Sequence, residues 1–151
     1  ALPWRHLAVL LPVFLADALA VTVVFPFLPF MVQSLFNFPP EEQHKIGYYA
    51  GLLGGSYEFG QIASSPFWGA LADRCGRRHV MRTCLLLGSV LMLAFGLSHS
   101  FWAALLIRFC QGLSNGAMSV GRACMADITD ASNETRAFSL IGIVWGSGDI
   151  L

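Results

Sequence analysis

The sequence is poor in charge, and its basic residues are almost all arginine. Charged residues make up 12% of the 151 residues, and Lys45 is the only lysine. A globular domain usually carries about 25% charged residues. The hydrophobic share is 56% and the formal net charge is zero. This composition favours a membrane protein over a soluble domain, and the lack of a basic excess predicts no nucleic-acid partner.

The sequence also lacks the usual patterns of metal centres and catalytic sites. Its four cysteines occur singly and none belongs to a C-x-x-C pair, so they predict free thiols rather than a zinc or redox site. Catalytic triads and phosphate-binding glycine loops are missing as well. We therefore predict that the chain is not an enzyme and holds no metal and no cofactor. The cysteines are Cys75, Cys84, Cys110 and Cys124.

The sequence contains several long hydrophobic runs. A helix needs roughly 20 apolar residues to cross the hydrocarbon of a bilayer. We predict an all-α membrane protein with helices at about 7–31, 46–71, 80–97, 101–126 and 137–151, the last one cut off. Pro26 and Pro29 should kink or end the first of them.

The first apolar run has an alternative interpretation as a secretory signal peptide. Residues 5–6 would be its basic end, 7–15 its core and 18–20 its cleavage site. The run continues well past residue 20, however, and Asp17 would lie unfavourably beside the core. We therefore favour a membrane-spanning helix.

A charged segment at 69–78 separates the second and third runs. Arg74, Arg77, Arg78 and Arg82 lie within nine positions here, whereas the polar segment 37–45 has no arginine. Because positive charge collects on the cytoplasmic side, the first segment is predicted to be cytoplasmic and the second external. In the helix before it, Gly47, Gly51 and Gly55 recur every four residues and predict a smooth ridge for close helix packing.

The charged segment resembles a family signature. Its order of residues follows G-x-L-a-D-r-x-G-r-k-x-x-L, the loop between helices 2 and 3 of the major facilitator superfamily, with Met81 in place of the last leucine. The matching residues are Gly69, Leu71, Asp73, Arg74, Gly76, Arg77 and Arg78. Residues 108–112 also resemble the R-x-x-Q-G signature of helix 4 in proton-coupled facilitators, where the arginine is linked to proton transfer.

Two further stretches, 46–51 and 112–116, look like the zinc-induced-facilitator-like and drug:proton antiporter group. That group often carries an Arg/Glu-Pro pair in helix 1, where this chain has Asp17-Ala18-Leu19. The resemblance implies that residues 1–151 are an N-terminal transmembrane bundle equal to the first five of twelve helices, so we expect a fragment. It also implies alternating access by rocking bundles.

Four ionisable residues fall inside the predicted helices: Asp17, Glu58, Arg108 and Asp149. Each costs at least about 2.5 kcal/mol at a helix centre, so it should face a cavity or a partner. At 1.5 Å per residue, Asp17 lies about 15 Å from the start of its helix, Glu58 about 18 Å and Arg108 about 12 Å. All three fall near the middle of a core roughly 30 Å thick.

Polar residues form stripes on two helices. Arg108, Gln111, Asn115, Ser119 and Arg122 follow helical steps and predict one continuous stripe with Gly112 and Gly116 beside it. Glu58, Gln61 and Ser65 form a shorter one. We predict that Asp17 or Glu58 carries a proton and that Arg108 pairs with Asp17; the alternative is a buried pair that only fixes packing. The predicted cavity residues are Asp17, Glu58, Gln61, Arg108, Gln111 and Asn115.

A charge latch is expected at the cytoplasmic face. By family resemblance, Asp73 and Arg77 oppose Asp127 and hold one conformation of the transporter. The alternative is an exposed ion pair worth under about 1 kcal/mol. The loop signature and latch together comprise Gly69, Asp73, Arg74, Gly76, Arg77, Arg78 and Asp127.

The sequence thus predicts an integral, multi-pass membrane protein of the plasma membrane or of an organelle such as the vacuole. The expected function is secondary transport of a small solute, coupled to protons, and the expected partners are that solute, protons and the lipid bilayer. Two alternatives are a facilitative uniporter without coupling and a truncated membrane protein that does not transport.

Overall fold

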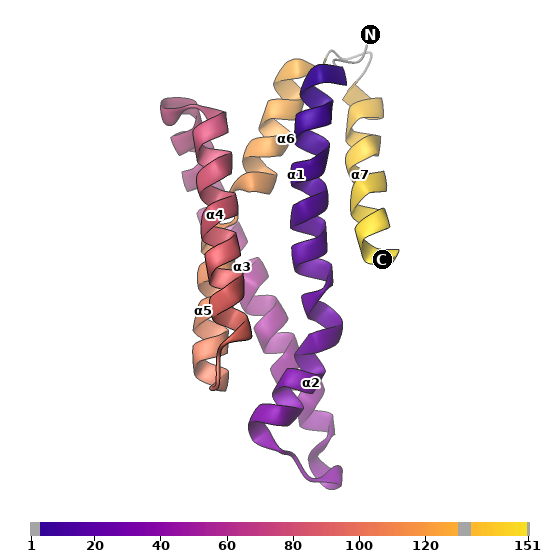
Figure 1. The fold of residues 1–151 in the computed structure, drawn as a ribbon, viewed down its shortest axis with the longest axis vertical. Coiled ribbons are helices and arrows are strands. Elements are labelled where there is room, and N and C mark those ends of the chain that lie inside the picture. Colours follow the sequence, from indigo (N-terminus) through magenta and orange to yellow (C-terminus); the bar gives the residue numbers. More distant parts are fainter. Residues whose placement is uncertain (1–3, 130–133, 151) are drawn as a thin grey trace.

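The computed structural model describes residues 4–129 and 134–150, and within these residues every regular element is a helix. The all-α prediction is therefore confirmed. Figure 1 shows the helices as an elongated, antiparallel bundle. They are α1 (Trp4–Thr22), α2 (Val24–Phe36), the short 3-10 helix η1 (Pro40–Glu42), α3 (His44–Cys75), α4 (Arg77–Gly96), α5 (Phe101–Ser114), α6 (Ala117–Ile128) and α7 (Glu134–Ile150).

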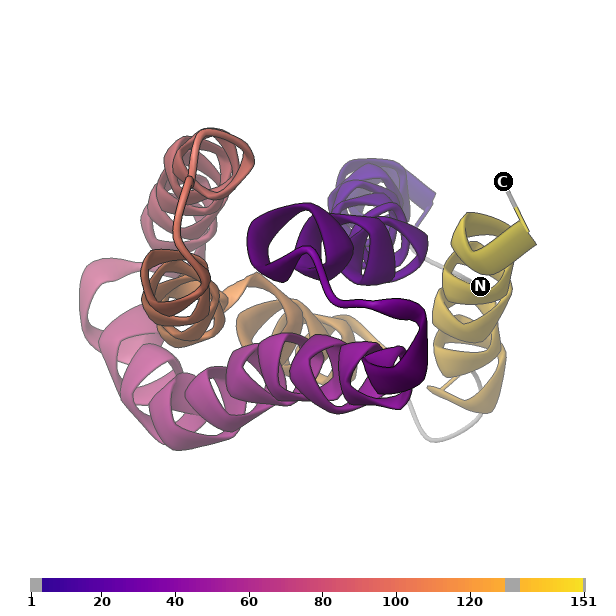
Figure 2. The ribbon, with the colours of Figure 1, turned by 90° about the horizontal axis from the view of Figure 1, so that it is seen from below.

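α3 packs against α2, α4, α5 and α6, whereas α1 packs against α2, α6 and α7. Both views place α1 between α4 on one side and α7 on the other (Figures 1 and 2). The start of α1, the junction of α3 with α4 and the end of α6 lie at one end of the bundle, and α2 and the α4–α5 turn lie toward the opposite end (Figure 1). This arrangement brings all the arginines of the 74–82 segment to the end where α1 begins.

The structure divides the first predicted helix, 7–31, into α1 and α2 and extends it to Phe36. The break falls at Val23, three residues before Pro26. Proline has no N–H to donate and its ring crowds the carbonyl four residues earlier, so the helix cannot pass this turn unchanged. Ala18 is fully buried in the bundle. The segment considered as a cleavage site is therefore part of the packed structure.

The segment 69–78 is not the loop that the sequence predicts. α3 continues as far as Cys75, and Gly76 alone separates it from α4. Gly76 has φ of +88°, a left-handed conformation that glycine adopts without the steric cost of a Cβ atom. The signature residues 69–74 therefore lie on the last turns of a helix 32 residues long.

The fourth predicted helix, 101–126, is also two helices. α5 ends at Ser114 and α6 begins at Ala117. The indole of Trp68 on α3 donates a hydrogen bond of 2.7 Å to the carbonyl of Leu113, one of those left without a helical partner where α5 ends. The same ring occupies the space beside Gly116, where any Cβ would collide with it. Trp68 thus stabilises the break from the neighbouring helix.

α3 packs closely against α5 at Gly60, which is not one of the three glycines of the predicted ridge. A Cβ atom on Gly47, Gly51 or Gly55 would meet nothing within 4 Å, so the predicted ridge is not a packing surface among the described residues. On Gly60 a Cβ would lie 2.5 Å from the carbonyl oxygen of Phe109 on α5. On Gly112 it would collide with the backbone of α3. α3 and α5 therefore approach each other closely at Gly60 and at Gly112, one of the two glycines beside the predicted polar stripe.

Replacing Gly60 by alanine should destabilise the bundle, because the added methyl group pushes α5 away from α3. Overpacking of this kind costs about 1–3 kcal/mol. We expect a lower melting temperature for the complete protein in detergent, followed by tryptophan fluorescence. Gly51→Ala is the matched control, since its methyl group meets open space. Equal melting temperatures for the two variants would contradict this account of the α3–α5 contact.

The apolar core is divided into two clusters. One lies at the end where α1 begins and includes Leu7, Phe14, Trp68 and Met125. The other lies toward the opposite end and includes Val24, Leu28, Leu53 and Phe101. The segment between them in α1, around Asp17, belongs to neither cluster, and that gap is where the polar residues gather.

Two stretches of the described residues are long and apolar enough to cross a membrane on length and composition. They are Leu7–Phe36, which comprises α1 and α2, and Arg77–Gly96, which is α4. Large apolar side chains on the outside of the bundle are also exposed, among them Phe30, Phe59 and Leu93. Lipid is the solvent that such a surface suits.

Candidate functional site

A cavity of about 180 Å³ lies between the two apolar clusters. It is a small space lined mostly by apolar residues of α1 and α4 and by six polar side chains from four different helices and the α5–α6 break. The six are Asp17, Tyr57, Ser89, Arg108, Gln111 and Asn115. The structure therefore brings together four of the six predicted cavity residues.

Asp17 and Tyr57 are joined through the side-chain amide of Asn115. The Nδ2 group of Asn115 donates a hydrogen bond of 2.9 Å to Asp17 Oδ1 and another, shorter one to the hydroxyl oxygen of Tyr57. Asn115 can reach both because it lies at the end of α5, where the helix breaks. The break thus positions a donor between α1 and α3 in the middle of the bundle.

Arg108 is the largest fully buried side chain, with only 1% of its surface exposed. Its Nη1 donates a hydrogen bond of 3.0 Å to Gln111 Oε1. Its guanidinium carbon lies 4.9 Å from the centre of the Tyr57 ring and 5.3 Å from that of Phe95. The negative faces of aromatic rings attract a cation at these distances, and this attraction offsets part of the cost of burying the charge.

The predicted ion pair between Arg108 and Asp17 is wrong for this conformation. No ion pair within residues 4–129 and 134–150 joins them, and Tyr57 and Asn115 link the two regions instead. Asp17 Oδ2 and Arg108 Nε are each buried without a protein hydrogen-bond partner. A polar cavity of this size has room for water, which needs two to four polar partners.

Glu58 and Gln61 lie elsewhere, in an open groove of about 610 Å³ between α3 and α6. Ser65, Ser119 and Arg122 line the same groove. The predicted continuous stripe on the fourth helix is therefore divided: Arg108, Gln111 and Asn115 face the cavity, and Ser119 and Arg122 face the groove. Glu58 and Arg122 are both exposed and make no ion pair within the described part of the chain.

Tyr57 is the cavity residue that the sequence analysis missed. It is buried, and it contacts both Asn115 through its hydroxyl and Arg108 through its ring. Neighbouring residues on a helix point about 100° apart, so Tyr57 faces the cavity while Glu58 faces the groove. A tyrosine beside an intramembrane carboxylate was the available signal, since its hydroxyl needs a partner when buried.

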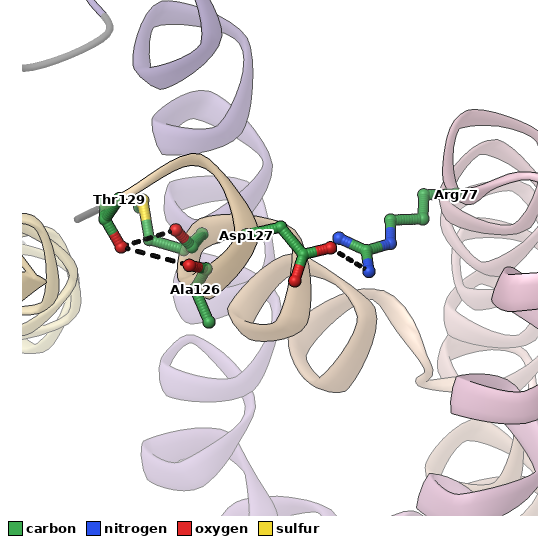
Figure 3. Close-up of polar contacts among 5 residues, drawn as sticks. Arg77, Ala126, Asp127 and Thr129 are labelled. Atoms are coloured by element: carbon green, nitrogen blue, oxygen red, sulfur yellow. Dashed lines mark hydrogen bonds and ion pairs between the residues drawn. The ribbon is translucent and has the colours of Figure 1, made fainter. Parts of the chain in front are cut away.

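At the end where α1 begins, Arg77 forms an ion pair with Asp127 of α6 (Figure 3). α6 ends shortly after this pair, where the hydroxyl of Thr129 donates to the carbonyl of Met125 at 2.8 Å. Asp73 is exposed and takes part in no ion pair among the residues described. The structure therefore gives the α4–α6 part of the predicted latch, without Asp73.

The described residues contain no group of three or more side chains that could together hold a metal ion. The side chain of Asp149, the fourth ionisable residue of the predicted helices, lies outside those that the structure describes.

Curated proteins similar to this chain carry transporter names. The Arabidopsis thaliana protein zinc induced facilitator-like 1 is 36% identical over 99% of this chain and 31% of its own length. A major facilitator superfamily multidrug transporter of Aspergillus fumigatus is 32% identical over 100% of this chain and 25% of its own. The class H tetracycline resistance protein of Pasteurella multocida is 25% identical over 97% of this chain and 36% of its own.

The chain thus spans about a quarter to a third of the length of these relatives. Its similarity to them extends over almost every residue that it has. The family description "Major Facilitator Superfamily" matches residues 10–151, which include the buried polar cavity, the Arg77–Asp127 pair and all seven α-helices except the first turns of α1. The chain therefore belongs to the Major Facilitator Superfamily and is part of an integral membrane protein.

Proposed function

We propose that the chain is the N-terminal helical bundle of a secondary transporter that moves a small solute by alternating access, driven by protons. The observation that carries the proposal is the buried cavity that Asp17 and Arg108 both line without forming an ion pair with each other. Ionisable residues at membrane depth usually mark a proton or substrate path, because their burial is costly. The name of one relative, a multidrug transporter, supports the same class.

Asp17 is the proposed proton carrier. One of its oxygens accepts from Asn115 and the other has no protein donor, so it has a free position for a proton. Water in the cavity would connect this oxygen with Arg108 Nε, the other buried atom without a partner. Through this water Arg108 would favour the charged form of Asp17, and loss of the connection would favour proton uptake.

The groove between α3 and α6 is the proposed surface for the solute. Glu58, Gln61, Ser119 and Arg122 offer both signs of charge and several hydrogen-bonding groups to a molecule beside the bundle. Tyr57 lines the groove as well as the buried cavity, and it is the one polar side chain common to both. It therefore provides a physical route by which solute contact would alter the surroundings of Asp17.

Two alternatives are an uncoupled uniporter and a product that does not transport. The proton-coupled transporter and these two alternatives predict different solute uptake into vesicles reconstituted with the complete protein. The first solute to test is tetracycline, which the name of one relative mentions. A proton-coupled transporter accumulates its solute only when a pH gradient is imposed. A uniporter equilibrates the solute with or without the gradient, and a non-transporting product does neither.

The expected topology gives a labelling test. A cysteine at Glu42, in the segment without arginine, should react with a membrane-impermeant thiol reagent in intact cells, because that segment is expected outside. A cysteine at Arg78 should react only after the cells are opened. Both variants are made in a background that lacks the four native cysteines. Labelling of Arg78→Cys in intact cells would reverse the orientation.

The Arg77–Asp127 pair gives a test of the latch. Asp127→Asn removes the ion pair between α4 and α6 and should shift the balance of transporter conformations by up to about fivefold, the equivalent of an exposed pair of about 1 kcal/mol. We expect slower transport at an unchanged amount of protein in the membrane. Asp73→Asn is also expected to slow transport, although Asp73 has no ion pair in the part of the chain that the structure describes.

Transport assays on both variants distinguish a latch from a solvated surface. If the Asp127→Asn and Asp73→Asn proteins both transport at the wild-type rate, the charges at this end have no role in the conformational change. If only Asp127→Asn is slow, the latch is limited to the pair seen in Figure 3.

A further inference from the structure

The side-chain amide of Asn115 makes hydrogen bonds to two other helices and, among the described residues, none to its own. Its backbone N–H donates to the carbonyl of Gly112 at 3.0 Å and ends α5 without the side chain. The amide nitrogen instead donates to Asp17 of α1 at 2.9 Å and to the hydroxyl oxygen of Tyr57 of α3. Helix capping therefore does not account for an asparagine side chain at this position.

These two acceptors fix the direction in which the amide faces. An ionised carboxylate can only accept hydrogen bonds, whereas a tyrosine hydroxyl can accept or donate. Asp17 in its ionised form therefore requires the N–H side of the amide, and Tyr57 adapts by accepting the second N–H. Both hydrogens of the amide are then in use, and Tyr57 keeps the group from rotating away from Asp17.

The two oxygens of Asp17 consequently have different surroundings. Oδ1 accepts from Asn115, while Oδ2 is buried and has no hydrogen-bond partner in the protein. The donor on Oδ1 is neutral, and it stabilises the ionised form without cancelling its charge, so the carboxylate can still take up a proton. A lysine or arginine in its place would form an ion pair and oppose that uptake.

The other polar side chains of the cavity are engaged elsewhere. Gln111 accepts from Arg108 at 3.0 Å, and the hydroxyl of Ser89 donates to a carbonyl of its own helix at 2.8 Å. Within the described part of the chain, the hydrogen-bond donor to Asp17 is therefore Asn115.

Ionisable side chains surround Asp17 from the helices that line the cavity and the groove beside it. They are Tyr57 and Glu58 of α3, Cys84 of α4, Arg108 of α5 and Arg122 of α6. No described side chain of α2 or α7 lines either space. Since none of these groups forms an ion pair with Asp17 among the described residues, the amide of Asn115 is its direct polar contact.

We propose that Asn115 is a positioning residue for the proton site: oriented by Tyr57, it occupies Oδ1 and makes Oδ2 the atom of Asp17 that takes up the proton. Oδ2 receives the proton from water in the cavity and returns it to water on release. In the neutral acid Oδ1 becomes the carbonyl oxygen and keeps its hydrogen bond from Asn115. This inference rests on the proposed function, in which Asp17 carries the proton.

Infrared difference spectra of the complete protein in lipid, taken between alkaline and acidic pH, test the assignment. The C=O band of protonated Asp17 is identified by its loss in Asp17→Asn. If Oδ2 carries the proton, the C=O oxygen is Oδ1, and the hydrogen bond from Asn115 lowers its stretching frequency. Asn115→Leu, similar in shape but without a donor, should shift the band to higher frequency. Ser89→Ala is the matched control in the same cavity and should leave the band in place.

Transport separates positioning from a merely structural contact. Asn115→Leu removes a hydrogen bond that stabilises the ionised form, so proton release slows. The rate of proton-driven uptake should fall about tenfold or more, the equivalent of one hydrogen bond to a charged group. Solute exchange, which needs no proton release, should keep its rate, whereas loss of a structural contact would slow both processes alike.

Tyr57→Phe gives a second, milder variant that remains informative if Asn115→Leu fails to fold. It keeps the ring beside Arg108 and removes the hydroxyl that accepts from the amide. The C=O band should broaden and move part of the way to higher frequency, because Asn115 is then free to rotate.

Two results would overturn the positioning role. A band at the wild-type frequency in both Asn115→Leu and Tyr57→Phe would show that the C=O oxygen of Asp17 does not accept from Asn115. An equal loss of uptake and exchange in Asn115→Leu would make Asn115 a structural link between helices. A different result tests the proposed function itself: if Asp17→Asn removes no band, Asp17 takes up no proton, and both proposals fail together.

Discussion

Replacing Arg108 by alanine should abolish proton-driven accumulation of solute by the complete transporter while solute exchange survives. A pH difference of two units supplies about 2.7 kcal/mol per proton, enough for roughly 100-fold accumulation when one proton moves with each solute. Without the guanidinium group, the cavity that Asp17 lines has no positive charge among its lining residues, and an ionised carboxylate is less favourable there. Asp17 should then retain its proton throughout the cycle, and the accumulation ratio should fall to about one.

Exchange is the internal control for this variant, because it needs no net movement of protons. Arg108→Lys keeps a charge over the Tyr57 ring but lacks the planar fork that reaches Gln111, so it should restore accumulation only in part. Full accumulation by Arg108→Ala would make Arg108 a packing residue. Loss of exchange together with accumulation would indicate a folding defect, which size-exclusion profiles of the detergent-solubilised variants would detect.

Asp17→Asn should uncouple transport from protons to a similar extent, and Glu58→Gln should not. The two carboxylates were equal candidates on depth alone, but they differ in surroundings. Asp17 lines the buried cavity and has one oxygen without a partner, whereas Glu58 is exposed in the open groove. The buried carboxylate with a free oxygen is therefore the better candidate for a proton carrier.

The measurement is the dependence of solute accumulation on the imposed pH gradient. For Asp17→Asn, accumulation should lose its dependence on the gradient, with exchange intact. For Glu58→Gln, the gradient dependence should remain and the apparent affinity for solute should change instead, since Glu58 lines the proposed solute surface. The opposite pattern would assign the proton to Glu58 and leave Asp17 as part of a structural hydrogen-bond network with Asn115.

The helical class of the chain could be predicted from the sequence, but the number of helices and their interruptions could not. Hydrophobic length indicates where a helix can cross a bilayer but not where it breaks. The break between α5 and α6 depends on Trp68, which is about 45 residues away and satisfies the carbonyl of Leu113 from another helix. A local pattern contains no information about such a partner.

The cavity residues show a similar division. The sequence predicted four of them, because a polar residue inside an apolar membrane helix must face a cavity or a polar partner. These four are Asp17, Arg108, Gln111 and Asn115. Their partners were not found, since the sequence does not specify how each helix is rotated about its axis. A rotation of about one residue on α3 decides whether Glu58 or Tyr57 reaches Arg108. The prediction that the glycine ridge packs against another helix was wrong for the same reason: the spacing of the glycines predicts a smooth helix face but not which element faces it.

The break at Asn115 and Gly116 has a consequence for how the protein is made. α5 has 14 residues and α6 has 12, so they are about 21 Å and 18 Å long. Neither half spans a hydrocarbon layer roughly 30 Å thick. The backbone groups freed at the break must also be satisfied away from water, and an exposed one costs several kcal/mol in lipid.

Part of that need is met by the indole of Trp68, which is synthesised earlier and belongs to α3. We therefore expect residues 101–128 to leave the translocation channel as one unit, and only against an α3 that is already in place. Insertion of this crossing would then be a docking event that depends on tertiary contact, rather than an independent partition of an apolar segment into lipid.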